Sequence, residues 1–465
     1  MALLKASRVR HSWDKSRSWV VSNRASGGAV IPLHSLKYIY KTSTPIKLTF
    51  MAPTPIRPVG YLERWSTVRH KLGYHNSVSL TATTSAPFVP ITAFAALKEC
   101  IKTHAVLSVT ILDASTLARV ECIDVCDLVT WEDSTDRTLE EVLAAEASTG
   151  FTEGSVAWRL RILRETTVVL SWCHGILDGE SGVMVMRTFL SSLGSSSSSS
   201  SSSSTAISPP TLPLSPPVEE LLSLTVSWSL LLKKGLELFL PWQRRLWTGP
   251  RISVVPANTN ILLLRFPAAM LRKRCREEET SITALIHAAI GVSILRLSGG
   301  IGIAGSIAIS LRRFLTDVAV LGVMAASVPH SHLPGEEGVW ERAREVKETI
   351  SRRLTVGTGD LNIALLQYVG DLYSFLRGRE GKERELGYGV SNLGMVDIEG
   401  VESLVFSQSA SVAGNALDVG IIGGGGEVCI SFEWLEGVLE NEFVEAVSEG
   451  IREVVEEAVG PELWK

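Results

Sequence analysis

The stretch SWCHGILDGE, residues 171–180, holds the residues of this chain best suited to acid–base chemistry. His174, Asp178 and Gly179 form an H-x-x-x-D-G pattern directly after a strand-like run. An imidazole with an ordinary pKa of about 6.5 can take a proton from a hydroxyl or an amine near neutral pH. We therefore interpret His174 as a candidate general base and Asp178 as a carboxylate that stabilises its loop. The alternative is a structural histidine followed by a common Asp-Gly turn.

The residues on either side of this pattern predict how it is positioned. Residues 166–172 are β-branched and apolar, which is typical of a buried strand, and the glycines that follow break that strand. From Ser181 to Leu193 apolar residues recur at helical spacing. The predicted order is strand, tight turn and helix, and such a turn can direct one imidazole into a cavity.

A pair of arginines provides a candidate partner for Asp178. The segment IAISLRRF, residues 307–314, ends a predicted strand with Arg312 and Arg313. An arginine that leaves an apolar strand normally needs a buried partner, and strand alternation places the two arginines on opposite faces. We favour Arg312 as the partner of Asp178, with two exposed arginines as the alternative.

A glycine-bounded segment, GYGVSNLG at residues 387–394, provides candidate ligand contacts. Ser391 and Asn392 lie between glycines, the last of which is Gly394. Their side chains and backbone N–H groups could bind a developing oxyanion or an amide-bearing substrate arm. A simple turn is the alternative. The run Gly423–Gly426 lacks the residues of a phosphate loop, and we interpret it as a hairpin turn.

Length and composition limit the class of protein. A chain of 465 residues suggests two domains of roughly 200 residues each. A net charge of -4, with no basic, aromatic-interleaved stripe, argues against nucleic-acid binding and favours a small-molecule substrate. The six cysteines show no disulfide-framework spacing, and Cys122 and Cys126 have no second ligand pair at zinc-site spacing. We therefore expect a reducing, cytoplasmic setting and no metal site.

Composition also divides the chain. Residues 1–55 form a basic, serine-rich extension, with nine Lys or Arg but only Asp14 as an acid in the first 50 residues. This composition resembles a mitochondrial transit segment, and the alternative is a natural start at Met51. A serine run and several prolines make residues 195–217 a linker between an N-terminal domain, 56–194, and a C-terminal domain, 218–465.

Both halves alternate strand-like and helical patterns, which predicts an α/β fold with mixed strand pairing. The predicted strands are 77–83, 106–112, 156–163, 167–172, 260–266 and 302–310, and the predicted helices are 92–103, 281–295, 339–354, 361–376 and 440–458.

The segment from Val218 to Trp242 is strongly apolar, but Glu and Lys interrupt it within the roughly 20 residues that a bilayer span needs. It is therefore not expected to span a membrane. A core or interdomain helix is favoured, and attachment to a membrane surface is the alternative.

The chain resembles the fungal alcohol acetyltransferases in three motifs: HGILDG at 174–179, SNLG at 391–394 and GYLERW at 60–65. These enzymes belong to the superfamily of chloramphenicol acetyltransferase, plant BAHD acyltransferases and peptide-synthetase condensation domains. The resemblance runs from about residue 57 to the C-terminus. It implies two pseudo-symmetric α/β domains, each a sheet with helices on one side, and an active-site channel at their interface.

The resemblance also implies a reaction. His174 would deprotonate an alcohol that attacks the thioester of acetyl-CoA or another acyl-CoA directly, without a bound cofactor. Asp178, Gly179 and Arg312 would support the loop, and Ser391, Asn392 and Gly394 would contact the thioester or the pantetheine arm. We expect a monomer acting on a small or hydrophobic alcohol, cytoplasmic, with peripheral contact to an internal membrane or mitochondrial targeting by residues 1–50 as alternatives.

Two departures from the family pattern matter. Cys173 stands where many relatives have a second histidine, and the serine run is atypical. The plant D-F-G-W-G motif is absent, which argues against a true BAHD member. Two other functions remain open: an N-acyltransferase or standalone condensation-like domain that uses a carrier-bound thioester, and a non-catalytic protein that binds a lipid or a partner.

Overall fold

The structure, a computed structural model, describes residues 52–134, 136–195, 204–232, 246–254, 257–460 and 463. The basic extension up to Met51, the serine run 196–203 and residues 233–245, which include the end of the apolar segment, lie outside the described residues. Among the described residues, no single helix has the length and hydropathy to cross a membrane. One pair of helices, 268–277 and 282–297, meets that test together by length and composition only, with a 90° bend between them.

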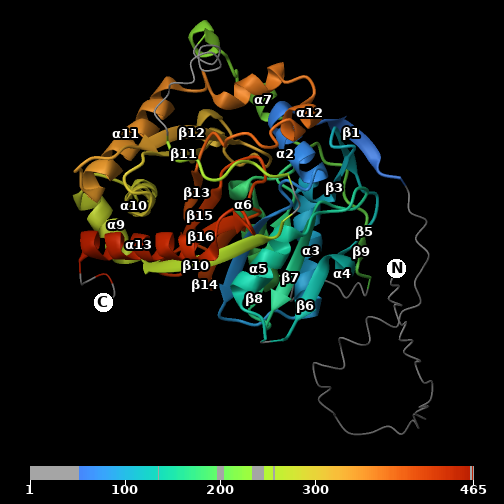
Figure 1. Cartoon of the computed structure of the whole chain (residues 1–465). Coiled ribbons are helices and arrows are strands. Elements are labelled where there is room, and N and C mark those ends of the chain that lie inside the picture. The colour runs from blue at the N-terminus through green and yellow to red at the C-terminus, as the bar shows by residue number, and fades with distance from the viewer. Residues whose placement is uncertain are drawn as a thin grey trace, which may run out of the picture. The chain divides into compact units, whose positions relative to one another are not determined.

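A five-stranded sheet in the order β14-β2-β8-β7-β6 carries the H-x-x-x-D-G motif at the end of its central strand (Figure 1). Its strands are β2 (Val78–Thr84), β6 (Val129–Glu132), β7 (Trp158–Leu163), β8 (Thr167–Trp172) and β14 (Val401–Gln408). All residues of β8 after Thr167 are buried, as the apolar run predicted. The associated helices are α3 (Pro90–Thr103), α5 (Leu139–Ser148) and α6 (Gly179–Ser195), and their apolar residues share one core with the sheet.

The second large sheet has six strands in the order β10-β16-β15-β13-β11-β12. Strand β13 pairs in parallel with both β11 and β15, and the other pairings are antiparallel. Its strands are β10 (Thr259–Pro267), β11 (Ile303–Ser310), β12 (Ala325–His332), β13 (Tyr388–Met395), β15 (Leu417–Gly424) and β16 (Glu427–Leu435). The associated helices are α9 (Ala268–Glu277), α10 (Ile282–Leu297), α11 (Val339–Val356) and α13 (Asn441–Val459).

Smaller elements complete the fold. A three-stranded sheet contains β1 (Thr54–Pro58), β3 (Val109–Leu112) and β4 (Thr116–Arg119), and β5 (Ile123–Asp124) pairs with β9 (Ala206–Ile207). The helical segments include α2 (Tyr61–Lys71), α4 (Val125–Leu128), α7 (Val218–Leu221) and α12 (Leu372–Arg377).

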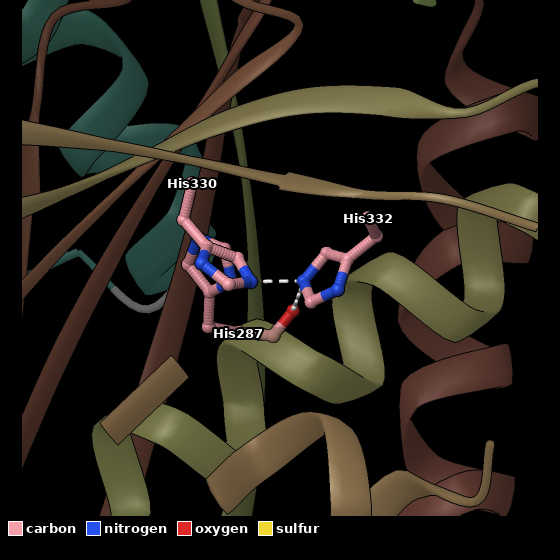
Figure 2. A group of neighbouring side chains, drawn as sticks. All are labelled: His287, His330 and His332. Carbon is pink, nitrogen blue, oxygen red and sulfur yellow. Dashed lines mark hydrogen bonds between the residues drawn. The ribbon is translucent and has the colours of Figure 1, made fainter. Parts of the chain in front are cut away.

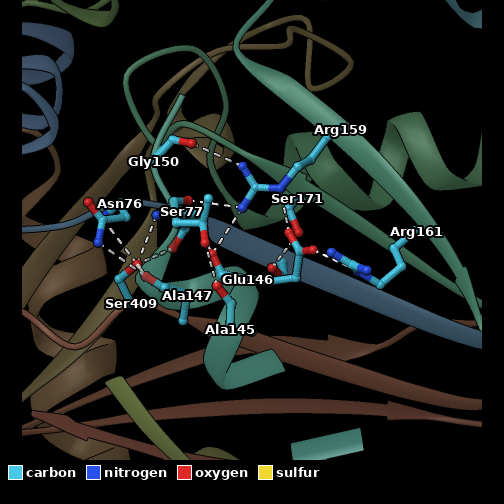
Figure 3. Close-up of polar contacts among 12 residues, drawn as sticks. Asn76, Ser77, Ala145, Glu146, Ala147, Gly150, Arg159, Arg161, Ser171 and Ser409 are labelled. Atoms are coloured by element: carbon cyan, nitrogen blue, oxygen red, sulfur yellow. Dashed lines mark hydrogen bonds and ion pairs between the residues drawn. The ribbon is translucent and has the colours of Figure 1, made fainter. Parts of the chain in front are cut away.

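Strand β14 comes from the second half of the chain but completes the sheet of the first half. It pairs antiparallel with β2, and Ser409, just beyond it, fixes the end of that pairing. The Ser409 hydroxyl donates to the Ala147 carbonyl at 2.5 Å and accepts from the Ser77 N–H at 2.8 Å (Figure 3). The two halves therefore share one continuous sheet.

A buried carboxylate joins α5 to β7 in the same region (Figure 3). Glu146 is 2.5 Å from Arg159 Nε and 2.9 Å from Arg161 Nε. Burial opposes ionisation, but the two guanidinium groups outweigh it and keep the pKa of Glu146 below its ordinary value. These contacts stabilise β7, which pairs with the strand that carries the motif.

Several predicted elements need correction. Residues 361–376 are not one helix: a 3₁₀ segment, Asn362–Tyr368, is separated from α12 because Asp371 caps a new helix start by accepting from the Ser374 N–H. The predicted strand 106–112 begins as a 3₁₀ turn, Ala105–Ser108. The SNLG segment lies in strand β13 rather than in a turn, with a left-handed backbone only at Gly394 (φ +77°).

The hairpin predicted at Gly423–Gly426 is confirmed. It joins β15 to β16, and Gly425 and Gly426 have φ values of +57° and +88°. Two successive positive φ angles are what a two-residue hairpin loop needs, and glycine adopts them without steric cost.

Candidate active site

His174 lies in the turn that follows β8, and short hydrogen bonds fix the turn around it. The Cys173 N–H donates to the Ala157 carbonyl at 2.9 Å, and the Ile176 N–H donates to the Cys173 carbonyl at 3.1 Å. Gly175 packs so closely against Thr67 of α2 that a β-carbon there would overlap the threonine side chain. The imidazole of His174 is half-buried, and its Nδ1 has no hydrogen-bond partner among the described residues.

Two basic side chains surround this imidazole. The His75 ring is centred 5.8 Å from the His174 ring at an interplanar angle of 58°. Desolvation lowers the pKa of His174 below 6.5, and the positive charge of Arg69 on α2 lowers this pKa further. Burial, Arg69 and His174 likewise hold the pKa of His75 well below its ordinary value. Both rings are therefore neutral near pH 7, and a neutral ring is the form that can accept a proton.

Asp178 caps helix α6 and fixes the far side of the turn. Its Oδ1 accepts from the Ser181 N–H at 2.9 Å, the geometry of a helix N-cap. Its Oδ2 accepts from the Met324 N–H at 2.8 Å, and its own N–H donates to the Gly322 carbonyl at 3.0 Å. Asp178 is 3% exposed. Because the carboxylate accepts hydrogen bonds from these backbone groups, Asp178 stabilises the loop.

Arg312 is the buried partner of Asp178. Its Nη1 lies 2.6 Å from Asp178 Oδ2 and 3.3 Å from Glu180 Oε2, and its Nη2 donates to Ser181 Oγ at 2.5 Å. Arg312 is 3% exposed, whereas Arg313 is exposed. Strand alternation, on which the choice of Arg312 over Arg313 rested, was the wrong reason, because residues Leu311–Phe314 form a 3₁₀ turn and not the end of a strand. The turn separates the two side chains as strand alternation would have done.

The SNLG segment reaches the motif through Leu393. A β-carbon on Gly179 would lie 2.6 Å from Leu393 Cδ2, so the missing side chain at 179 lets the two segments pack together. Asn392 Nδ2 donates to Thr283 Oγ1 of α10 at 2.8 Å, and its Oδ1 accepts from the Gly394 N–H at 2.7 Å. One amide hydrogen of Asn392 is left for a ligand. Ser391 pairs with Gly420 in the sheet.

Three cavities lie next to the motif, and one of them, of about 340 Å³, is lined by Ile176 of the motif and by Gly322 among other residues. A cavity of about 480 Å³ is lined by Glu180, Thr283, Arg312, Arg313 and Asn392 with seven other residues, so it brings three sequence-predicted segments together. A cavity of about 210 Å³ is lined by Thr67, His70, Lys71 and Cys173 with eight other residues. Because Cys173 precedes His174 in the chain, this cavity lies close to the imidazole-bearing turn.

Sequence reasoning missed Arg69, His75 and Thr283. The GYLERW segment was the only signal toward Arg69, because it starts the helix that carries this arginine. Nothing in the spacing of His75 or Thr283 distinguishes them from structural residues, since each reaches the site through contacts distant in sequence.

The fold and the buried loop define the class of protein. The structure is similar to a trichothecene 15-O-acetyltransferase from Fusarium sporotrichioides, with a TM-score of 0.63 and 14% identity over 90% of this chain and 100% of that chain. It is also similar to the epimerization domain of tyrocidine synthetase B, with a TM-score of 0.61 and 13% identity over 88% and 97% of the two chains. The predicted α/β fold of the chloramphenicol-acetyltransferase and condensation-domain class is confirmed.

Sequence comparison narrows this class. A probable alcohol acetyltransferase of Fusarium pseudograminearum is 25% identical over 346 residues, covering 63% of this chain and 70% of that protein. A probable alcohol acetyltransferase of Aspergillus fumigatus is 24% identical over 467 aligned positions, covering 84% and 97%. No family model matches the chain. The resemblance to the fungal alcohol acetyltransferases is confirmed, and the comparisons support an acyltransferase enzyme.

Proposed function

We propose that this protein is an acyl-CoA-dependent O-acyltransferase that uses His174 as its general base and a small or hydrophobic alcohol as its acceptor. One observation carries the proposal. A neutral, half-buried imidazole lies on a loop fixed by the Asp178–Arg312 ion pair, and Gly179 of that loop packs against Leu393 of the SNLG segment. The two similar proteins named as probable alcohol acetyltransferases support the choice of an alcohol acceptor.

The proposed reaction is a direct transfer. His174 takes the proton of the alcohol as the alcohol oxygen attacks the thioester carbonyl carbon, which gives a tetrahedral oxyanion. The oxyanion collapses, the carbon–sulfur bond breaks, and the imidazolium returns its proton to the departing CoA thiolate. Because Nδ1 of His174 is buried, the proposal assigns the proton transfer to Nε2.

The 480 Å³ cavity is the proposed site of the acyl-CoA arm. Arg313 is exposed at this cavity and offers a positive charge to a CoA phosphate, and Asn392 offers an amide hydrogen to the pantetheine amides. Arg312 lines the same cavity, but its guanidinium is already used by Asp178, Glu180 and Ser181. Arg312 is therefore proposed to position the loop and not to bind the acyl-CoA arm.

The test is thiol release from acetyl-CoA by the purified chain starting at Met51, in the presence of a panel of short and long alcohols. We expect release only when an alcohol is present, with an ester as the second product. The donor separates the alternatives: transfer only from a carrier-bound thioester, or only to amines, would replace the proposal with a condensation-like or N-acyltransferase function. Vesicle or partner binding without any transfer would favour the non-catalytic alternative.

The position of Arg69 predicts the pH dependence of this reaction. Protonated His174 cannot act as a base, so kcat/KM must fall as the pH drops through the pKa of His174. Since burial and Arg69 lower this pKa, we expect activity to persist below pH 6.5. Replacing Arg69 with Met removes a positive charge, so the pKa of His174 rises and the acid limb of the pH–rate profile moves to higher pH.

The matched control is Arg64→Met on the same helix. Arg64 donates to the Gly370 carbonyl at 2.8 Å and is not among the charges that act on His174. We expect its acid limb to coincide with that of the wild type. Identical limbs in Arg69→Met and the wild type would show that Arg69 does not tune the base.

A further inference from the structure

Three buried histidines gather on the helix side of the second sheet (Figure 2). His287 lies on α10, and His330 and His332 lie on the edge strand β12. Burial alternates along β12, so these two histidines, two positions apart, both face inward. Exposure of the three residues is 0%, 7% and 1%. None of them belongs to the candidate active site.

The nitrogen atoms of the cluster have the spacing of a small coordination site. His287 Nδ1 lies 3.0 Å from His332 Nε2, and one nitrogen from each of the three rings forms a set within 4.8 Å of one another. Tetrahedral Zn²⁺ with bonds of about 2.05 Å requires nitrogen atoms about 3.3 Å apart. The first pair is already near this spacing, and the third ring needs a movement on the order of 1 Å.

The hydrogen bonding of the cluster is incomplete. Each ring has a buried nitrogen with no partner among the described residues: His287 Nε2, His330 Nε2 and His332 Nδ1. The other ring nitrogens do have partners: His330 Nδ1 lies 3.2 Å from Thr349 Oγ1, His332 Nε2 lies 3.1 Å from the His287 carbonyl, and His287 Nδ1 lies 3.1 Å from the Tyr388 hydroxyl. His330, with one nitrogen held by a hydroxyl and the other without a partner, has the arrangement typical of a metal-binding histidine. The close pair, His287 Nδ1 and His332 Nε2, consists of the partnered nitrogens of these two rings, so an ion bound there would replace their mutual hydrogen bond.

The chemistry of the donor set indicates the kind of ion. No carboxylate belongs to the described cluster. An all-imidazole donor set favours Zn²⁺ or a similar transition-metal ion over Mg²⁺ and Ca²⁺, which prefer oxygen ligands.

We propose that His287, His330 and His332 bind one divalent transition-metal ion of the zinc class, which fastens α10 to the edge strand β12. Gly291, one turn after His287, supports this arrangement because a β-carbon there would overlap the His332 ring. Thr283, one turn before His287, receives the amide of Asn392. The ion therefore fixes the helix that positions the SNLG segment. The H-S-H spacing at 330–332 is the sequence signal for this cluster, whereas the expectation of no metal site considered only the cysteines.

The experiment uses the tag-free chain from Met51 after treatment with a chelator and desalting. Equilibrium dialysis against Zn²⁺ with elemental analysis measures the bound metal, and Co²⁺ reports the coordination geometry through its visible absorption. We expect about one Zn²⁺ per chain, a visible cobalt band typical of tetrahedral sites, and a melting temperature that rises by several degrees with Zn²⁺. His330→Gln should weaken Zn²⁺ binding at least about 10-fold, the low end of the effect of altering a metal site's surroundings.

The control is His104→Gln, which changes a half-buried histidine bonded to Thr188 and should keep full metal binding. Less than about a tenth of an ion per wild-type chain, with no change in melting temperature, would overturn the proposal. Zinc binding of unchanged affinity in His330→Gln would overturn it as well, because the metal would then be held elsewhere. If the variant does not fold, the cobalt spectrum of the wild type decides: absence of the tetrahedral band rejects the site.

Discussion

Replacing His174 with alanine is expected to lower kcat/KM for acyl transfer about 10²- to 10⁴-fold, which is the usual contribution of a positioned general base. This loss corresponds to about 3–5 kcal/mol of transition-state stabilisation. Most of the loss should appear in kcat, because the proposed acyl-CoA cavity is lined by Arg313 and Asn392 and not by the imidazole. Thiol release from acetyl-CoA at saturating alcohol measures the effect.

Two observations separate lost chemistry from lost structure in this variant. The melting temperature should change little, because His174 is half-buried and its Nδ1 makes no hydrogen bond that the substitution would remove. His104→Gln, a histidine variant whose native ring bonds to Thr188, should retain activity. Undiminished transfer by His174→Ala would reject His174 as the base and leave the acyltransferase fold without its proposed catalyst.

Replacing Arg312 with methionine is expected to lower the free energy of unfolding by about 3–5 kcal/mol, because it leaves Asp178 as a buried charge without its partner. Asp178 would keep its two backbone donors, Ser181 and Met324, but would lose the guanidinium at 2.6 Å. Activity should fall as well, since the turn that carries His174 would no longer be held against residues 320–324. Urea denaturation, with the slope compared to that of the wild type, measures the change in stability.

The chain offers a closely matched control. Arg313→Met makes the same substitution one residue away at an exposed position, and it should change the free energy of unfolding by less than about 0.5 kcal/mol. The double variant Asp178→Asn with Arg312→Met should be less destabilised than the sum of the two single variants, because both remove one interaction. Equal stability of Arg312→Met and Arg313→Met would show that the ion pair does not hold the loop.

The sequence by itself determined the local units of the site. The apolar run of β8, the glycines after it and the helical periodicity of α6 predicted strand, turn and helix, and the structure contains these three elements in that order. The hairpin at Gly423–Gly426 was predictable for the same reason. Each of these units depends on periodicity and turn chemistry within a few residues, and that information is present in the sequence at the place where it acts.

Only the tertiary structure decided what surrounds His174. Arg312 is 134 positions from Asp178 and meets it through a 3₁₀ turn, and β14 joins a sheet whose neighbouring strand lies more than 300 residues earlier. The charge of Arg69 acts on His174 from helix α2, and His287 lies beside His330 and His332 because α10 packs on β12. Such contacts follow from which faces of the helices and sheets are buried together. A short-range pattern in a single sequence does not encode that choice.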